Sequence, residues 1–254
     1  MPAIHLSGWD LLAIFVLSLQ GTVIAFVRQP AWKAIVLSLP FPFTLMSLSS
    51  GRLIDASSVQ GIALFFVFLL TVWFLHGRQR VRIIPAITLA ALGYCAIGSL
   101  IAATVPRTPV TFWVSAIAVF GLGLVLRLTL PARPEPGYRS ALPVWIKLPI
   151  VAGIVLSLIL VRNTLQGFAT VFPIMGTIGS YEGRFSLWTL VRQGPVIMVC
   201  MSVMMAAGYL VQGQLGLGGA LAVGWLAYLA VFLPYMWYYS RRQETRPQVK
   251  GSIL

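Results

Sequence analysis

Two stretches of the sequence place helix-breaking prolines and polar side chains inside otherwise apolar runs. The first contains Pro42, Thr44 and Ser47 and is followed by Arg52. Proline has no backbone amide, so it leaves a carbonyl one turn earlier without its helical donor. Within a membrane such a carbonyl must be satisfied by protein or water. A span interrupted in this way is therefore a candidate to line a solute-binding site.

The second stretch begins about 130 residues later with Pro173 and Thr177, and continues with Tyr181, Glu182 and Arg184. Arginine offers a carboxylate or another anion a two-pronged contact, and an ion pair between Glu182 and Arg184 could hold a gate. The candidate substrate-binding residues are Pro42, Thr44, Ser47, Arg52, Pro173, Thr177, Tyr181, Glu182, Arg184 and Arg192. Two simpler interpretations stay open: the prolines only kink helices to fit their neighbours, and the arginines only reach the membrane interface.

Other chemistry finds little support in the residue types. Cys95 and Cys200 lie in separate apolar runs, and His5 and His76 stand alone, so neither a metal site nor a redox pair is expected. No nucleophile, base and orienting group follow a known catalytic spacing, and no phosphate-binding loop is present. We expect no enzyme activity, no cofactor and no metal.

The composition identifies the surroundings of the chain. Of its 254 residues 59% are hydrophobic and only 9% are charged, and the mean hydropathy is +0.91. Soluble domains are about 25% charged, so most of this chain must face lipid or other apolar helices. The net charge of +13 would suggest nucleic acid in a soluble protein, but here the basic residues lie between apolar runs and nucleic acid is excluded as a partner.

Apolar runs of about 20 residues predict an all-α bundle of membrane-spanning helices. The nine predicted spans are 9–27, 31–49, 58–76, 83–104, 110–130, 143–161, 164–181, 190–211 and 215–239. When the 18 basic residues are assigned to alternate sides, 15 fall on one side and only Arg52, Arg107 and Arg162 on the other. The positive-inside rule then places the N-terminus outside and the C-terminus in the cytoplasm.

Several signatures recur at similar separations. Arg28 and Arg162 each end a span, Pro42 and Pro173 each interrupt one, Gly51-Arg52 and Gly183-Arg184 follow, and Gln60-Gly61 and Gln193-Gly194 open the next. These pairs are 131 to 134 residues apart, which is the pattern of two four-span units joined by one linker span and therefore inverted relative to each other. A simpler interpretation stays open: proline and glycine are common in spanning helices, and an arginine at the interface can follow any span. The predicted divisions are a first unit at 1–105, a linker span and loop at 106–142, a second unit at 143–240 and a basic tail at 241–254.

The run from Phe172 to Arg184, FPIMGTIGSYEGR, resembles the Phe-Pro, small and apolar, Tyr and Glu/Gly pattern of GlpM-like proteins. These are small four-span bacterial inner-membrane proteins. The first half departs from the pattern, since Ser50 stands where tyrosine would be and no glutamate precedes Gly51-Arg52. The resemblance implies a bacterial inner membrane and a fused pair of four-span units, but no substrate.

The leading functional hypothesis is a permease for a small neutral or anionic solute that passes near the interrupted second and seventh spans. The expected partners of such a permease are the lipid bilayer around it and the small solute that it binds. The main alternative is a non-catalytic subunit or assembly factor of a larger membrane complex, with another membrane protein or a second copy as partner. An enzyme acting on a lipid within the membrane is a third hypothesis.

Overall fold

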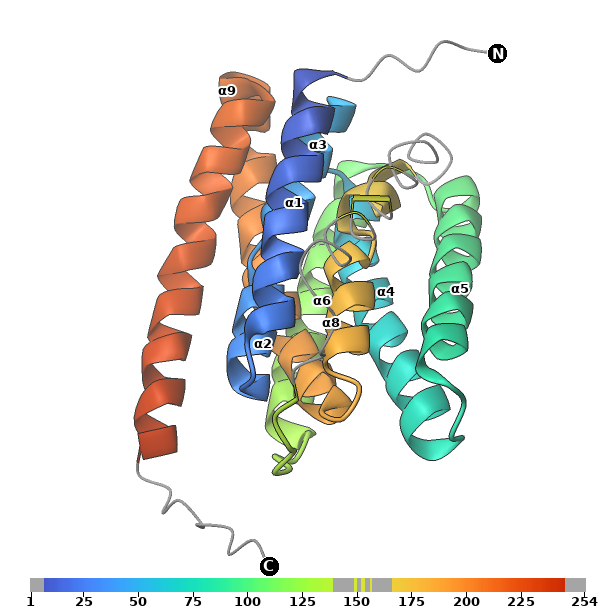
Figure 1. Ribbon diagram of the computed structural model, residues 1–254. Coiled ribbons are helices and arrows are strands. Elements are labelled where there is room, and N and C mark those ends of the chain that lie inside the picture. The colour runs from blue at the N-terminus through green and yellow to red at the C-terminus, as the bar shows by residue number, and fades with distance from the viewer. Residues whose placement is uncertain (1–6, 139–148, 150–151, 154–155, 157–165, 245–254) are drawn as a thin grey trace, which may run out of the picture.

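The computed structural model describes residues 7–138, 149, 152–153, 156 and 166–244, and this part of the chain forms helices and no strand (Figure 1). The helices are α1 (Gly8–Phe26), α2 (Pro30–Ser38), α3 (Phe41–Ser50), α4 (Ala56–Trp73), the π-helical turn η1 (Phe74–Arg78), α5 (Ile83–Thr104), α6 (Pro109–Thr129), the 3-10 helix η2 (Gln166–Val171), α8 (Ile174–Glu182) and α9 (Leu187–Glu244). Six helical segments are long and apolar enough to cross a membrane. The protein is an all-helical, multi-pass membrane protein, as predicted. The predicted span 143–161 and Arg162 lie almost wholly outside the described residues.

The last helix is a hairpin. Its apolar part, Leu187–Trp237, has 51 residues, which would extend about 75 Å as a straight helix. The backbone leaves helical geometry at Gly216, where φ is 66°, a conformation that favours glycine. The two halves then pack so closely that a Cβ atom on Gly224 would lie 2.9 Å from the carbonyl oxygen of Met204. Figure 1 shows the halves side by side, and they coincide with the predicted runs 190–211 and 215–239.

The uninterrupted helix α4 and the interrupted segments α3, η2 and α8 lie inside the bundle, and α5 and α6 lie towards its outside. α4 packs against α5, α6, η2 and α9, while α1 packs against α3 and α8. The outer helices α5 and α6 expose large apolar side chains such as Leu100 and Ile117, which suits a lipid-facing surface. On α3 and α8 even polar residues such as Ser47 and Ser180 are buried. The polar, broken segments are therefore shielded from lipid.

Basic residues gather at one end of the bundle. α1 begins at the upper end in Figure 1 and α9 finishes at the lower end. Of the described basic residues, Arg52 and Arg107 lie in upper connections. The others lie at or near helix ends of the lower side. For the described residues, this uneven distribution agrees with the one predicted by assigning the basic residues to alternate sides of the membrane.

Three of the five acidic residues stabilise helix N-termini. Asp10 forms a capping box at the start of α1, and Asp55 is the N-cap of α4. The carboxylate of Glu135 accepts hydrogen bonds from the first backbone amides of α9. An acid at a helix N-terminus is favoured by the helix dipole and by the unpaired amides there. These carboxylates therefore have structural partners at the ends of the bundle.

Candidate functional site

The first interruption separates α2 from α3 at Leu39 and Pro40. Pro40 is the N-cap of α3, and its missing amide deprives the carbonyl of Val36 of a helical donor. The side-chain amide of Gln20 on α1 donates to that oxygen at 2.8 Å. The sequence placed this break at Pro42, but Pro42 lies in the first turn of α3, where proline is tolerated.

Pro42 nevertheless has a consequence, because it leaves the carbonyl of Ser38 without its donor from the next turn. The hydroxyl of Tyr228, on the second half of α9, donates to this oxygen at 2.6 Å. Both residues are buried. The break in the first interrupted helix is therefore completed by a side chain that is 190 residues away in the sequence.

The second interruption separates η2 from α8, and Pro173 is the N-cap of α8. The buried hydroxyl of Tyr94, on α5, donates to the carbonyl of Phe168 in η2 at 2.9 Å. The ring of Tyr94 also meets the rings of Phe168 and Phe172 edge-on. Each interruption is thus held by a tyrosine from the other half of the chain.

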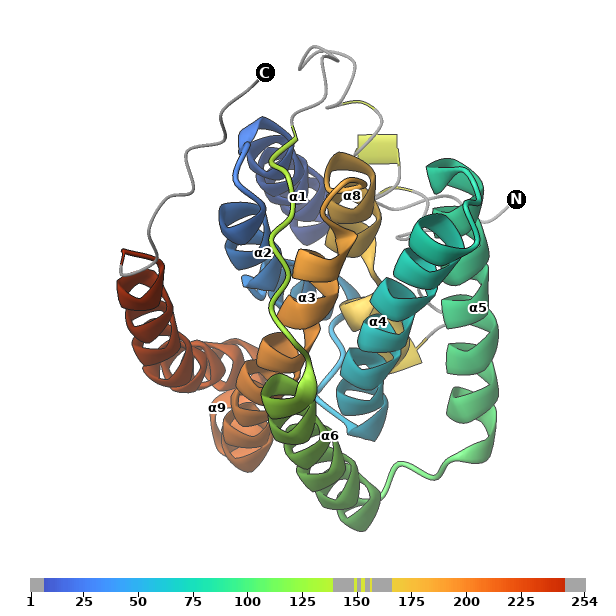
Figure 2. The same cartoon turned by 90° about the horizontal axis from the view of Figure 1, so that it is seen from below.

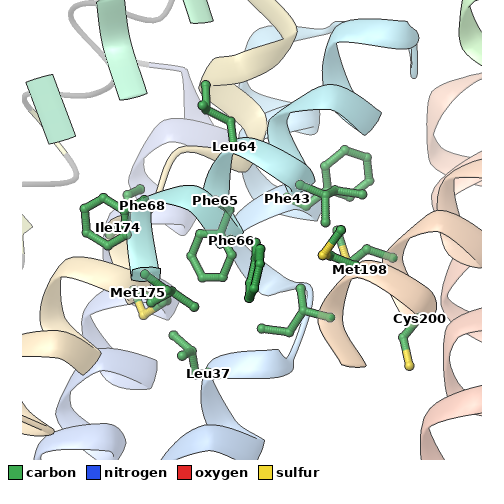
Figure 3. Close-up of a cluster of buried hydrophobic side chains, with 14 of the residues drawn as sticks. Leu37, Phe43, Leu64, Phe65, Phe66, Phe68, Ile174, Met175, Met198 and Cys200 are labelled. Carbon is green, nitrogen blue, oxygen red and sulfur yellow. The ribbon is translucent and has the colours of Figure 1, made fainter. Parts of the chain in front are cut away.

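The two interruptions line one cavity. Its volume is 50 Å³, and α2 and η2 contribute the residues beside both breaks. Figure 3 shows Leu37, Phe43, Phe65 and Met175, from four different helices, converging in this region. The lining consists of Leu37, Ser38, Leu39, Pro40, Pro42, Phe43, Phe65, Thr170, Val171, Phe172, Met175, Ile197 and Met201. Sequence reasoning predicted that the two broken spans would share a site, and the geometry brings them together.

A larger cleft of 210 Å³ lies towards the lower end, between the start of α2, the start of α9 and the connection after α6. Arg133, Arg192 and Gln193 contribute polar groups to it. The guanidinium of Arg192 donates to the carbonyl of Leu130 at 3.4 Å, and that of Arg133 lies 4.2 Å from the centre of the Trp188 ring. Glu135 also lines the cleft, which is therefore polar and carries both arginines and a carboxylate, in contrast to the cavity.

One hydrogen bond joins a residue of the cleft to a residue of the cavity. Gln193 lines the cleft and Ser38 lines the cavity. The side-chain amide of Gln193 donates to the hydroxyl of Ser38 at 2.7 Å, and both side chains are buried. The cleft and the cavity therefore lie one after the other along α2 and α9.

The connection after α6, residues Pro131–Tyr138, crosses the lower end of the bundle as an extended strap (Figure 2). Glu135 fastens it to α9, as described above. At its far end the carbonyl of Tyr138 accepts a hydrogen bond from Lys33 at 2.8 Å, and the hydroxyl of Tyr138 accepts one from Arg184. The strap is thereby tied to α2, α8 and α9.

Lys33 is almost fully buried at this lower end, with 1% of its surface exposed. Besides Tyr138, its ammonium group donates to the carbonyl of Glu182, the last residue of α8. A cation at a helix C-terminus is favoured by the helix dipole. From the sequence, Lys33 is interpreted only as a marker of membrane orientation, because no neighbouring residue indicates that its side chain is buried.

The predicted ion pair between Arg184 and Glu182 is replaced by other contacts of Arg184. Its guanidinium donates to the backbone oxygen of Tyr181 at 3.1 Å and lies over the rings of Tyr138, Tyr181 and Phe185. Stacking of a planar guanidinium on aromatic rings is a common alternative to an ion pair. Arg184 therefore anchors the strap.

The remaining predicted site residues fall into four groups. Pro42 lines the cavity, and Pro173 begins α8 beside it. Thr44 and Thr177 each donate to a carbonyl in the preceding turn of their own helix, and Thr44 also accepts a hydrogen bond from the indole of Trp225 on α9 at 2.8 Å. Arg52 lies at the upper end, whereas Arg192 lies in the lower cleft. Ser47 is buried on α3, away from the lining of the cavity.

Several corresponding residues in the two halves are separated by nearly the same interval. Pro40 replaces Pro42 as the partner of Pro173, because these two prolines are the N-caps of the half-helices α3 and α8. The pairs are Pro40 and Pro173, Thr44 and Thr177, Ser47 and Ser180, and Gln60 and Gln193, all 133 residues apart, together with Tyr94 and Tyr228, 134 apart.

Comparison of the chain with protein-family models, curated proteins and solved structures finds no match. Within the described residues no three His, Cys, Asp or Glu side chains come close enough together to hold a metal ion.

Proposed function

We propose that the protein is a permease for a small neutral or anionic solute, which occupies the cavity between the two interrupted helices. The observation that carries the proposal is that Leu39 and Phe172, one from each break, line the same hollow. Transporters commonly bind solute where discontinuous helices meet near the middle of the membrane. A kink that served only packing would not require both breaks to face one cavity.

The proposed architecture is nine spans, arranged as two four-span units in opposite orientation around a linker span. The constant interval between corresponding residues supports the duplication. The reciprocal use of Tyr94 and Tyr228 supports it further, since each tyrosine holds the break of the other unit. α3 leads from the cavity to the upper end and α8 to the lower end (Figure 1), which is the relation expected of inverted units.

The proposed location is the bacterial inner membrane, with the N-terminus outside and the C-terminus in the cytoplasm. The collection of basic residues at the lower end supports this orientation through the positive-inside rule. The likeness of Phe172–Arg184 to GlpM-like proteins supports the bacterial membrane. In this orientation the cleft and the strap face the cytoplasm.

Thiol accessibility tests the proposal. Cys95 and Cys200 are first replaced by alanine, and Leu39→Cys is introduced as a reporter in the cavity. A small uncharged methanethiosulfonate is added to one side of sealed vesicles, while glutathione on the other side consumes any reagent that crosses. The matched control is Ala13→Cys, on α1 in the packed core with no exposed surface.

The proposal expects Leu39→Cys to react from at least one side much faster than Ala13→Cys, because solute and water must reach a transport site. Equal, very slow reaction of both cysteines from both sides would contradict a permease. That outcome would favour the alternative of a scaffold subunit in a membrane complex.

A further inference from the structure

The cavity is lined without charge. None of the side chains described as lining it is ionisable, and Ser38 and Thr170 supply its hydroxyl groups. The nearest arginine along α9, Arg192, belongs to the cleft and donates to the backbone of Leu130. An ion without a counter-charge is strongly disfavoured in such surroundings.

The cavity is also small. A single water molecule needs about 10–15 Å³ of space measured in this way, so 50 Å³ accommodates on the order of three or four heavy atoms. The rings of Phe43 and Phe65 and the side chain of Met175 bound it. The hollow is partly open, and molecules of this size fill the space between these side chains without a change in the surrounding helices.

Two buried hydroxyls lie on the half-helices α3 and α8, outside the lining of the cavity. Ser47 follows Phe43 by one turn on α3, and Ser180 occupies the corresponding position on α8. Both are buried, and neither hydroxyl has a hydrogen-bond partner among the described residues. Since an unpaired buried hydroxyl is costly, these two groups are suited to bind water or a polar solute along α3 and α8.

The hydrogen bond between Gln193 and Ser38 joins a residue of the cleft to a residue of the cavity. Ala34 and Gln193 line the cleft, while Ser38 and Ile197, one turn further along the same two helices, line the cavity. A solute that moved between the two hollows along α2 and α9 would meet the Gln193–Ser38 contact. When this hydrogen bond opens, the amide of Gln193 and the hydroxyl of Ser38 can each form a hydrogen bond with an uncharged polar solute instead.

We propose that the solute is an uncharged, hydrogen-bonding molecule of about three or four heavy atoms, and that it passes between cleft and cavity by displacing the Gln193–Ser38 hydrogen bond. The inference rests on the proposed permease function and narrows its substrate class to neutral solutes. The basic residues of the cleft then serve orientation and strap attachment.

Flux into proteoliposomes of the full-length purified protein tests the substrate class. The probes are two pairs matched in size and shape, urea with nitrate and formamide with formate, and xylitol serves as a large neutral probe. Urea and formamide are expected to enter faster than into protein-free liposomes, whereas nitrate, formate and xylitol are not. Conduction of either anion as fast as its neutral counterpart would overturn the inference, and so would the absence of protein-dependent flux for both neutral probes.

The gate is tested with Gln193→Ala and Ser38→Ala, which remove opposite ends of one hydrogen bond. Each is expected to raise the urea flux by about threefold to tenfold, the equilibrium effect of one net hydrogen bond. The control is Gln212→Ala, because Gln212 also bridges two elements by donating to and accepting from the backbone of Ile54, but lies away from both hollows. A urea flux that is unchanged in both gate variants, or raised equally by Gln212→Ala, would overturn the gate.

Failure of this inference can be distinguished from failure of the proposed function. If Leu39→Cys reacts readily with the uncharged thiol reagent while only anions are conducted, the permease stands and the substrate class is wrong. If Leu39→Cys is as unreactive as Ala13→Cys and no probe is conducted, both are wrong.

Discussion

Tyr94 and Tyr228 stand 134 residues apart, and each donates its buried hydroxyl to a backbone carbonyl at the interruption in the opposite half of the chain. A helix break inside a membrane needs a substitute donor for the carbonyl it frees. Tyr228 supplies that donor to Ser38, four residues before Pro42, and Tyr94 bonds the carbonyl of Phe168 in η2, so each break depends on correct packing of both halves. The breaks are thereby fixed features of the fold.

Removing either hydroxyl should destabilise the protein. Tyr94→Phe and Tyr228→Phe each remove a buried hydrogen bond to a backbone carbonyl, so each should lower the free energy of unfolding by about 0.5–1.5 kcal/mol. Reversible denaturation in detergent would measure the loss. Tyr209→Phe is the control, because Tyr209 stacks on Phe112 and no hydrogen bond of its hydroxyl is found among the described residues. A loss as large for Tyr209→Phe as for the other two would contradict the assigned role.

The hairpin of α9 should be sensitive to a single methyl group. In Gly224→Ala the new Cβ atom would lie 2.9 Å from the carbonyl oxygen of Met204, so the halves must move apart at a cost of about 1–3 kcal/mol. Gly218→Ala, where no atom lies within 4 Å of the new Cβ, should be neutral or slightly stabilising. The midpoint of thermal unfolding would compare the two, and equal midpoints would argue against close packing of the halves.

The strap should loosen when Arg184 is replaced. Arg184→Ala removes the hydrogen bond to Tyr138 and the stacking on its ring, so amide hydrogen exchange across Pro131–Tyr138 should accelerate while membrane insertion is unchanged. Arg184→Lys should leave amide exchange across the strap nearly as fast as Arg184→Ala does, because lysine lacks the planar group that stacks.

Arg82→Ala is the matched control for the strap, since Arg82 is an exposed arginine at the same end of the bundle. Its exchange pattern across the strap should equal that of the unmodified protein. Unchanged exchange in Arg184→Ala would show that Glu135 and Lys33 alone retain the strap.

The cap formed by Glu135 should be measurable in the same experiment. Glu135→Gln keeps the shape of the side chain but removes the charge from the N-terminus of α9, where its oxygens accept from Trp188 and Thr189. A loss of about 0.5–2 kcal/mol is expected, together with faster exchange of the first amides of α9. An equal loss from Arg82→Ala would show a general effect of surface charge instead.

Periodicity and composition were sufficient to predict the helical class, the bounds of most spans and the two interruptions. Long apolar runs identify spans because the bilayer requires them, and proline marks a break because it lacks a donor. The sequence placed the first break at Pro42 and not at Pro40, because both prolines interrupt the same run and only packing selects between them.

The polar contacts within the site could not be predicted in this way. Tyr228 looks like any other aromatic residue of an apolar run, and its acceptor on Ser38 is distant in the sequence. Lys33 and Arg184 were interpreted from charge and spacing, whereas their actual partners lie on a strap that has no periodic pattern. The sequence therefore identified the breaks but not the groups that hold them together.

The most direct measurement of the central claim compares Leu39→Cys with Phe172→Cys, one at each break, in the background without native cysteines. If both cysteines line one solute-accessible cavity, opening the gate with Gln193→Ala should raise the rates of their reaction with the uncharged reagent from the lower side together, by a similar factor. If Gln193→Ala changes neither rate, or if one cysteine reacts only from the upper side and the other only from the lower side, the two breaks do not share a site and the account is contradicted.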